Sequence, residues 1–112
     1  MNAIQVGLCS MLLLWAGQSV ADQALVQNGK QVYQHWCAPC HAPGARHPGT
    51  NALAAKYKGQ LPPALEQRTN LTQAFITQYV RHGFSIMPFF RKTEISDADL
   101  RAIGAYLMRN NK

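Results

Sequence analysis

The sequence Cys37-Ala38-Pro39-Cys40-His41 carries the strongest chemical signal in this chain. The spacing C-x-x-C-H is typical of the covalent attachment of a c-type haem. Two thiols at this spacing can add to the two vinyl groups of one porphyrin, and the adjacent imidazole is then held where it can bind the iron. We therefore predict one covalently bound haem c, attached through Cys37 and Cys40, with His41 as an axial ligand of the metal.

Two other uses of a C-x-x-C pair fit this sequence less well. A redox motif of the thioredoxin type follows a strand in a βαβ pattern, and no such pattern precedes Cys37. A structural zinc site needs a second pair of ligands, and no cysteine follows Cys40. A zinc half-site or a bare dithiol is the alternative to haem.

Residues 1–21 have the pattern of a secretory signal peptide. An apolar run from Leu8 to Ala16 precedes Ser19-Val20-Ala21, after which cleavage is expected. The run is too short to span a bilayer, so no stable membrane insertion is expected after cleavage. No Lys or Arg precedes the run, which leaves a retained membrane anchor as the alternative. Residues 22–112 are then expected to form one domain.

This predicted mature domain is small and basic. A chain this short buries a modest core and generally needs a staple or a cofactor to be stable. The formal net charge is +6, and every Lys, Arg, Asp and Glu lies within residues 22–112. A basic surface can attract an acidic protein, nucleic acid or anionic lipid. Because the charges are not grouped as in a nucleic-acid-binding module, we expect an acidic protein partner and no nucleic acid.

Three helices and no strand are predicted in this domain. The first covers roughly Gln23 to Trp36, where apolar residues recur at helical spacing. The second has Thr72 as its N-cap and ends at Gly83, and the third has Ser96 as its N-cap with Asp99 at the capping-box position. The predicted fold class is therefore all-α.

The segment between the motif and Thr72 is rich in Pro and Gly, which interrupt any long element. A short helix near Asn51 to Tyr57 is the exception that the pattern allows. No internal repeat or low-complexity tract is present, so one domain is the economical interpretation.

Beyond the motif, the predicted mature chain resembles small single-haem class I cytochromes c along nearly its whole length. Gly29, Tyr33 and Cys37 follow the family pattern G-x-x-x-aromatic-x-x-x-C, and residues 103–107 look like the matching segment of the last helix. The resemblance implies that Gly29 lets the two terminal helices cross closely, with Tyr33 and Tyr106 packed at the crossing. The implied architecture is the class I cytochrome c fold, with three main helices and loops around one covalent haem.

The same resemblance implies a second axial ligand. Met87-Pro88 looks like the family's distal segment, in a loop between the second and the last helix. A thioether favours ferrous iron and raises the reduction potential relative to harder ligands. Met108 would have to unwind the last helix to reach iron. The remaining histidines are expected to be surface or capping groups: His35, His47 and His82.

The sequence departs from the family after the motif. Many members have a Gly-Pro-x-Leu segment whose proline carbonyl accepts a hydrogen bond from the proximal imidazole and thereby fixes the ring. Here residues 47–53 are His-Pro-Gly-Thr-Asn-Ala-Leu. We predict Pro48 as the acceptor, with Gly49 or Thr50 as alternatives.

The resemblance implies an electron-transfer protein rather than an enzyme. Covalent haem attachment in bacteria takes place outside the cytoplasm, so a periplasmic location is expected. The chain would take single electrons from a dehydrogenase with a flavin or quinone cofactor and pass them to a downstream oxidase or cytochrome. Residues 80–90 also resemble the distal segment in cytochrome subunits of p-cresol methylhydroxylase-type flavocytochromes, which favours a flavoprotein that oxidises phenolic substrates.

The alternative is a peroxidase-like or gas-binding haem protein, which would require that Met87 does not bind the iron. For the carrier, an apolar patch near the thioether edge and a basic rim are candidate docking groups. The patch comprises Pro39, Phe89 and Phe90, and the rim comprises Arg46, Lys56, Lys58, Arg91 and Lys92.

Overall fold

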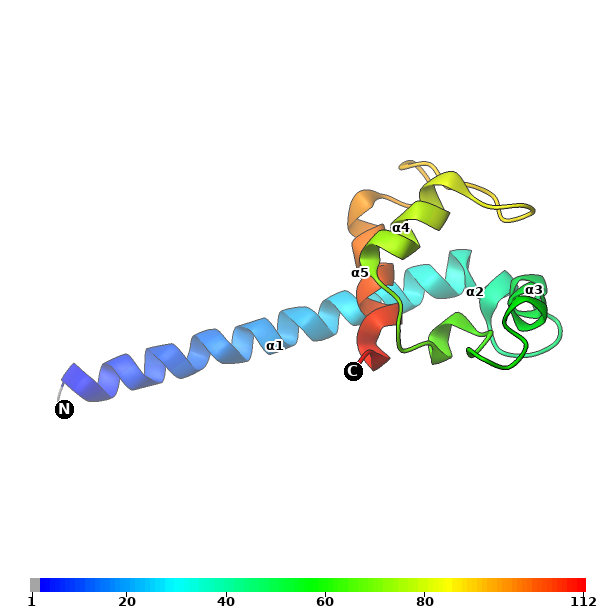
Figure 1. The fold of residues 1–112 in the computed structure, drawn as a ribbon. Coiled ribbons are helices and arrows are strands. Elements are labelled where there is room, and N and C mark those ends of the chain that lie inside the picture. The colour runs from blue at the N-terminus through cyan, green and yellow to red at the C-terminus, as the bar shows by residue number, and fades with distance from the viewer. Residues whose placement is uncertain (1–2) are drawn as a thin grey trace.

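A computed structural model gives an all-helical chain, as predicted (Figure 1). It describes the backbone of residues 3–112 and the side chains from Val20 onward. In this part of the chain the β-type pairing is confined to one isolated bridge between Phe84 and Met87. The elements are α1 (Ala3–Trp36), α2 (Ala38–His41), α3 (Pro48–Tyr57), the 3-10 turn η1 (Leu65–Gln67), α4 (Gln73–His82), α5 (Asp97–Leu107) and the 3-10 turn η2 (Met108–Asn110).

Helix α1 is longer than predicted, because it begins at Ala3 rather than near Gln23. No proline interrupts this stretch, so nothing in the sequence ends the helical hydrogen-bond ladder before Trp36. Met1 and Asn2 of the predicted signal peptide lie outside the described residues, and cleavage before Asp22 stays a prediction. No helix in residues 3–112 combines the length and the apolar character needed to cross a membrane.

Local side-chain caps start α4 and α5 where the sequence predicted. The Thr72 hydroxyl accepts a hydrogen bond from the Phe75 N–H at 3.2 Å, and the Ser96 hydroxyl accepts one from the Asp99 N–H at 3.0 Å. Each cap satisfies one of the N–H groups that a helix start leaves without a partner. The apolar residues beside the caps are buried, namely Leu71 and Ile76 at α4 and Ile95 and Leu100 at α5.

The crossing of α1 and α5 forms the centre of the domain. A Cβ added at Gly29 would collide with the backbone carbonyl of Ala102, so glycine permits this close approach. Tyr33 is fully buried, and its ring centroid lies 5.4 Å from that of Tyr106. The packing implied by the family resemblance is therefore present. The core around this crossing also contains Leu71, Ile76, Val80, Ile95, Leu100, Ile103 and Leu107.

The remaining elements project from one end of this core. Helices α2 and α3 follow the C-terminal end of α1, while the loop after α4, yellow in Figure 1, extends over the same end of the molecule. The C-x-x-C-H motif lies at α2, and Met87 lies in the loop after α4. The fold thus brings two segments, about 50 residues apart in the chain, to one end of the domain.

Candidate cofactor site

The motif forms a single helical turn directly after α1. The N–H groups of Cys40 and His41 both donate to the Cys37 carbonyl, at 3.1 and 2.9 Å. Both thiols are free, with Cys37 half-buried and Cys40 exposed. This short turn places the two sulfur atoms and the imidazole on a compact, hydrogen-bonded segment.

The environment of Cys37 differs from that of a redox-active thiol. Burial, and to a smaller extent the Cys40 thiol, raises the pKa of Cys37 to about 12. Thiols that act as nucleophiles or metal ligands have a lowered pKa, because the thiolate is the reactive form. Cys37 is therefore not in the activated, thiolate form that a redox dithiol uses. In addition, no three His, Cys, Asp or Glu side chains gather into a candidate metal site within the described part of the chain.

The His41 imidazole is half-buried and lies against the start of α3. A Cβ added at Gly49 would lie 2.8 Å from its Cε1 atom and 2.9 Å from Nδ1, so the ring lies directly on the glycine backbone. Burial lowers the pKa of His41, which keeps the ring neutral at pH 7. A neutral imidazole is the form that binds a metal. Its buried Nδ1 has no hydrogen-bond partner.

Pro48 is the first residue of α3, next to this imidazole. We predicted a hydrogen bond from His41 to the Pro48 carbonyl. The structure does not contain it, since the His41 Nδ1 atom has no partner there. A carbonyl in the first turn of a helix is directed along the axis toward the residue four positions later. Thr50 instead ties the loop to the motif, since its hydroxyl donates to the Ala42 carbonyl at 2.8 Å. The role of Pro48 in the haem-loaded protein stays a prediction.

Met87 lies at the base of a tight hairpin after α4. The backbone groups of Phe84 and Met87 pair in both directions, with N···O distances of 3.1 and 3.0 Å. Ser85 has a φ of 55° and Gly83 a φ of 68°. A Cβ at Gly83 would lie 2.5 Å from the Met87 carbonyl and 2.9 Å from the Phe89 nitrogen. Position 83 therefore requires glycine for two reasons, which are its positive φ and the close return of the chain beside it.

Arg81 anchors the segment that follows this hairpin. Its Nη1 donates to the carbonyls of Phe90 and Ile95, at 3.1 and 2.8 Å. Its Nη2 forms an ion pair with Asp97 at 2.9 Å, and Lys92 contacts the other oxygen of that carboxylate at 2.9 Å. Hydrogen bonds from Lys92 and Arg81 lower the pKa of Asp97. One side chain thus fastens the loop to α4 and to the start of α5.

We expect Arg81→Gln to lower the free energy of unfolding by about 2 kcal/mol, because it leaves the carbonyl of the buried Ile95 without its donor. Chemical denaturation measures this change. The control is Arg91→Gln, which breaks only an exposed pair with Glu94 at 3.6 Å and should change the stability by less than about 0.5 kcal/mol. Equal losses in the two variants would contradict the anchoring role of Arg81.

The alternative iron ligands have other contacts. Met108 is half-buried and packs against the core. The histidine rings pair with the backbone or with a neighbouring ring: His47 Nδ1 lies 3.0 Å from the Pro39 oxygen, His82 Nδ1 lies 3.0 Å from the Gln78 oxygen, and His35 packs edge-on against Trp36. These contacts agree with the surface and capping roles expected for the histidines.

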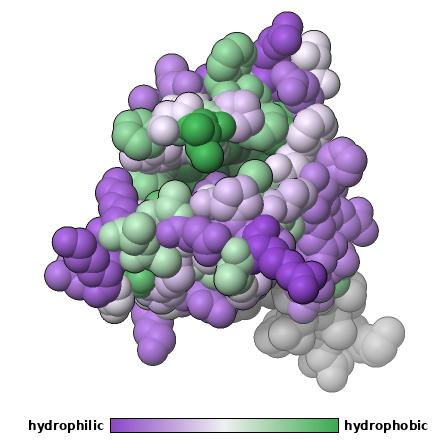
Figure 2. Space-filling model, turned by 90° about the vertical axis from the view of Figure 1, so that its right-hand side faces the viewer, coloured by the Kyte–Doolittle hydropathy of each residue, from purple (hydrophilic) through white to green (hydrophobic). Residues whose placement is uncertain are grey.

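Large apolar side chains are exposed on α4 and on the loop after it. The exposed fractions are 42% for Phe75, 67% for Phe84, 84% for Ile86 and 58% for Phe89. Figure 2 looks onto the end of the molecule that carries α3 and this loop, and it shows apolar residues around a hollow between an upper and a lower part. An apolar macrocycle held at the motif would cover such surface. The free thiols, the neutral imidazole and the apolar surroundings therefore fit a haem.

Comparisons with known proteins agree with this chemistry. Residues 24–107 match the family described as cytochrome C oxidase, cbb3-type, subunit III. The chain is 33% identical over 96 residues to the 4-cresol dehydrogenase [hydroxylating] cytochrome c subunit of Pseudomonas putida. The aligned residues make up 86% of this chain and 71% of that protein. It is 27% identical over 107 residues to cytochrome c6 of Cyanidium caldarium, and this alignment spans 96% of this chain and 91% of that protein. No solved structure gives a significant match.

Proposed function

Because the chain belongs to the cytochrome c family, we propose that it is an exported carrier of single electrons with one covalent haem c. Its relatives are electron-transfer proteins, one of them a subunit of a dehydrogenase. The observation that carries the proposal is the neutral, half-buried imidazole of His41 beside two free thiols. The bound haem would supply reversible exchange of one electron between ferric and ferrous iron.

Each site residue has a role in this proposal. Cys37 and Cys40 hold the cofactor covalently, so it is retained in both oxidation states. His41 and Met87 would both bind the iron, which would leave no position at the metal for a substrate or a gas. The Met87 thioether also raises the reduction potential. The hairpin and the Arg81 anchor would hold Met87 in place for this role.

The proposed electron donor is a periplasmic dehydrogenase with a flavin or quinone cofactor. The support is the 33% identity to a cytochrome subunit whose name gives 4-cresol dehydrogenase as its enzyme. A flavoprotein that oxidises phenolic compounds is therefore the donor we propose first. The proposed acceptor is a downstream oxidase or another cytochrome. Export through the predicted signal peptide of residues 1–21 would bring the chain to that compartment.

Two spectroscopic measurements on the purified protein test the proposed cofactor and its ligands. Haem staining of the denatured chain detects covalent attachment, and we expect a stained band. The ferric protein should be low-spin and show the near-infrared charge-transfer band of thioether ligation. High-spin ferric iron without that band would contradict the carrier and favour the peroxidase-like or gas-binding alternative.

We expect the rate of reduction by the dehydrogenase to fall as salt rises. Salt shortens the screening length from about 30 Å at 0.01 M to about 8 Å at 0.15 M, which weakens steering by exposed charges. Lys56 is exposed on α3, whereas Lys92 is already paired with Asp97, so Lys56→Glu is the cleaner charge reversal. Stopped-flow reduction of Lys56→Glu across a salt series should show a slower rate and a weaker salt dependence.

The matched control for this series is Lys30→Glu, the same charge change at an exposed position of α1. It should leave most of the salt dependence in place. A rate that is indifferent to salt and to Lys56→Glu would place the docking face elsewhere on the molecule.

A further inference from the structure

Two aromatic contacts hold the ligand loop, residues 84–90, against the helices. At the start of the loop, the Phe84 ring lies edge-on to Tyr79 of α4, with the ring centroids 6.2 Å apart and the planes at 75°. At its end, the Phe90 ring lies edge-on to Trp36 of α1, with the centroids 5.7 Å apart and the planes at 73°. Both pairs have the edge-to-face geometry that aromatic rings prefer, at centroid distances of about 4.5 to 7 Å. The proposed distal iron ligand lies between these two contacts.

The contact at Phe90 is the firmer of the two. Phe84 is 67% exposed, whereas Phe90 is half-buried and packs against the hydrophobic core. The Phe90 N–H donates to the Val80 carbonyl at 2.8 Å, and the Phe90 carbonyl accepts from Arg81 at 3.1 Å. These bonds hold the backbone of Phe90, and Trp36 holds its ring.

Trp36 joins this contact to the attachment motif. It is the last residue of α1 and directly precedes Cys37. The Cys37 N–H donates to the Tyr33 carbonyl at 2.8 Å, which continues the helical hydrogen bonds past Trp36. The indole itself is half-buried, packs against the core, and has the His35 ring edge-on at a centroid distance of 4.8 Å. Trp36 is therefore fixed relative to the cysteine that would carry the haem.

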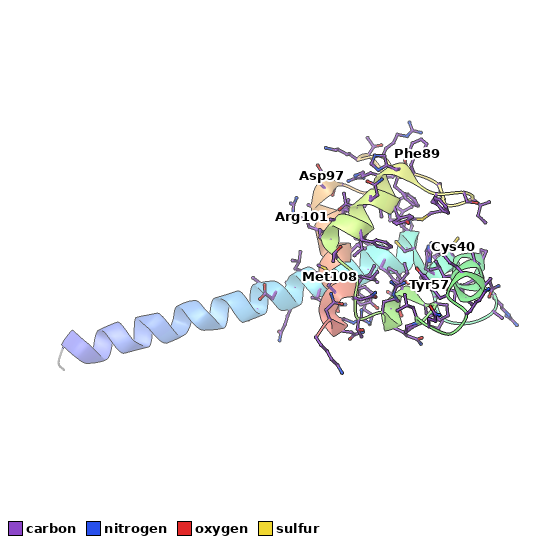
Figure 3. The ribbon with its side chains drawn as sticks, viewed as in Figure 1. Cys40, Tyr57, Phe89, Asp97, Arg101 and Met108 are labelled. Carbon is purple, nitrogen blue, oxygen red and sulfur yellow. The ribbon has the colours of Figure 1, made fainter. Side chains whose placement is uncertain are left out.

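Fixing Phe90 limits where Met87 can move. Only Pro88 and Phe89 separate the two residues, and three steps along an extended chain span at most about 11 Å. Pro88 restricts this link further, because its ring fixes φ. Figure 3 shows Phe89 above Cys40 at the same end of the molecule. The Met87 thioether is thus tethered at short range to the Trp36 contact.

We propose that Trp36 is a positioning residue, which keeps Met87 on the haem iron by holding Phe90. The inference rests on the proposed function, because it requires covalent haem and the Met87 ligand. The ligand loop then has a closed state, with the thioether on the iron, and an open state, with that axial position free. The contact between Trp36 and Phe90 belongs to the closed state, so it shifts the equilibrium toward that state. Opening matters most in the ferric protein, because a thioether favours ferrous iron.

The test measures cyanide binding to the ferric, haem-loaded protein by stopped flow. At low cyanide the rate is proportional to the open fraction, since cyanide binds only when Met87 has left the iron. In Trp36→Leu we expect the rate to rise about two- to tenfold, the factor that corresponds to loss of one aromatic pair. The near-infrared thioether band should persist, because Met87 still binds the iron in most molecules. Trp36→Phe keeps a ring at this position and should restore most of the original rate.

Val26→Ala is the matched control, because it removes apolar packing against the core from the same helix. Ten residues of helix separate it from Trp36 by about 15 Å. It should lower the melting temperature and leave the rate of cyanide binding unchanged. A rate in Trp36→Leu that matches the rate in Val26→Ala would overturn the inference, because it would reduce Trp36 to a residue of the core.

Phe90→Leu keeps the proposal testable if Trp36→Leu does not fold, because it removes the other ring of the same contact. It should also raise the rate of cyanide binding, and an unchanged rate would contradict the proposal. In the double variant the second substitution should add little, since both break one contact. Increases that multiply in the double variant would show that the two rings act independently and would overturn the inference. A protein that stains for haem but shows these contrary rates overturns this inference alone, whereas absence of staining overturns the proposed function.

Discussion

Replacing both attachment residues, Cys37→Ala with Cys40→Ala, is expected to give a chain that retains no haem after denaturation and shows no cooperative melt. Cys37 packs against the hydrophobic core, and the large apolar side chains beyond α4 remain exposed without a covering group. The free energy of unfolding of a domain is only about 5 to 15 kcal/mol. Loss of a central apolar cofactor therefore removes a decisive share of this free energy. Haem staining and thermal circular dichroism measure the two effects.

The matched controls for the double variant are the single substitutions. Each keeps one thioether bond, so each should retain stained haem and melt at a temperature between those of the unchanged protein and the double variant. A haem-free double variant with a sharp, cooperative transition would show that the helical core is stable without the cofactor.

Met87→Ala is expected to leave the covalent haem in place and to lower the reduction potential. Axial ligands set haem potentials over a range of roughly 0.8 V, and loss of the thioether should lower the potential by a sizeable fraction of that range. The same change opens one axial position, so the ferric protein should bind cyanide readily and lose the near-infrared band. Voltammetry and cyanide titration measure these effects.

Met108→Leu is the control for this experiment, since Met108 packs against the core in η2 and the substitution nearly conserves its volume. It should leave the potential and the spectrum unchanged. A Met87→Ala protein with unaltered potential and cyanide affinity would rule out Met87 as the ligand.

Features that depend on adjacent residues were predictable from the sequence. Thr72 and Ser96 cap their helices through N–H groups three residues away, so the pattern contains both partners. The C-x-x-C-H motif is local for the same reason. The start of α3 was predicted three residues late, at Asn51 instead of Pro48. Proline is favoured at the first helical position, but here it was interpreted only as an interruption of helices.

The anchoring arginine of the site was missed because its partners are distant in the chain. Arg81 bonds to groups 9 to 16 residues away. In the sequence, it is one of many cations on a basic chain, and no periodicity marks it. Only the packing of α4 and α5 shows that it is anchored to backbone carbonyls.

The raised pKa of Cys37 bears on whether haem is attached before or after the chain folds. Because burial raises its pKa to about 12, the Cys37 thiol stays protonated at pH 7 in the folded chain. In an extended chain the thiol has a pKa of about 8.5 and is open to solvent. Bond formation at this sulfur is therefore far easier before the helices close around it. The polypeptide would be best modified while still unfolded, and the finished domain would then assemble around a haem already bound to it.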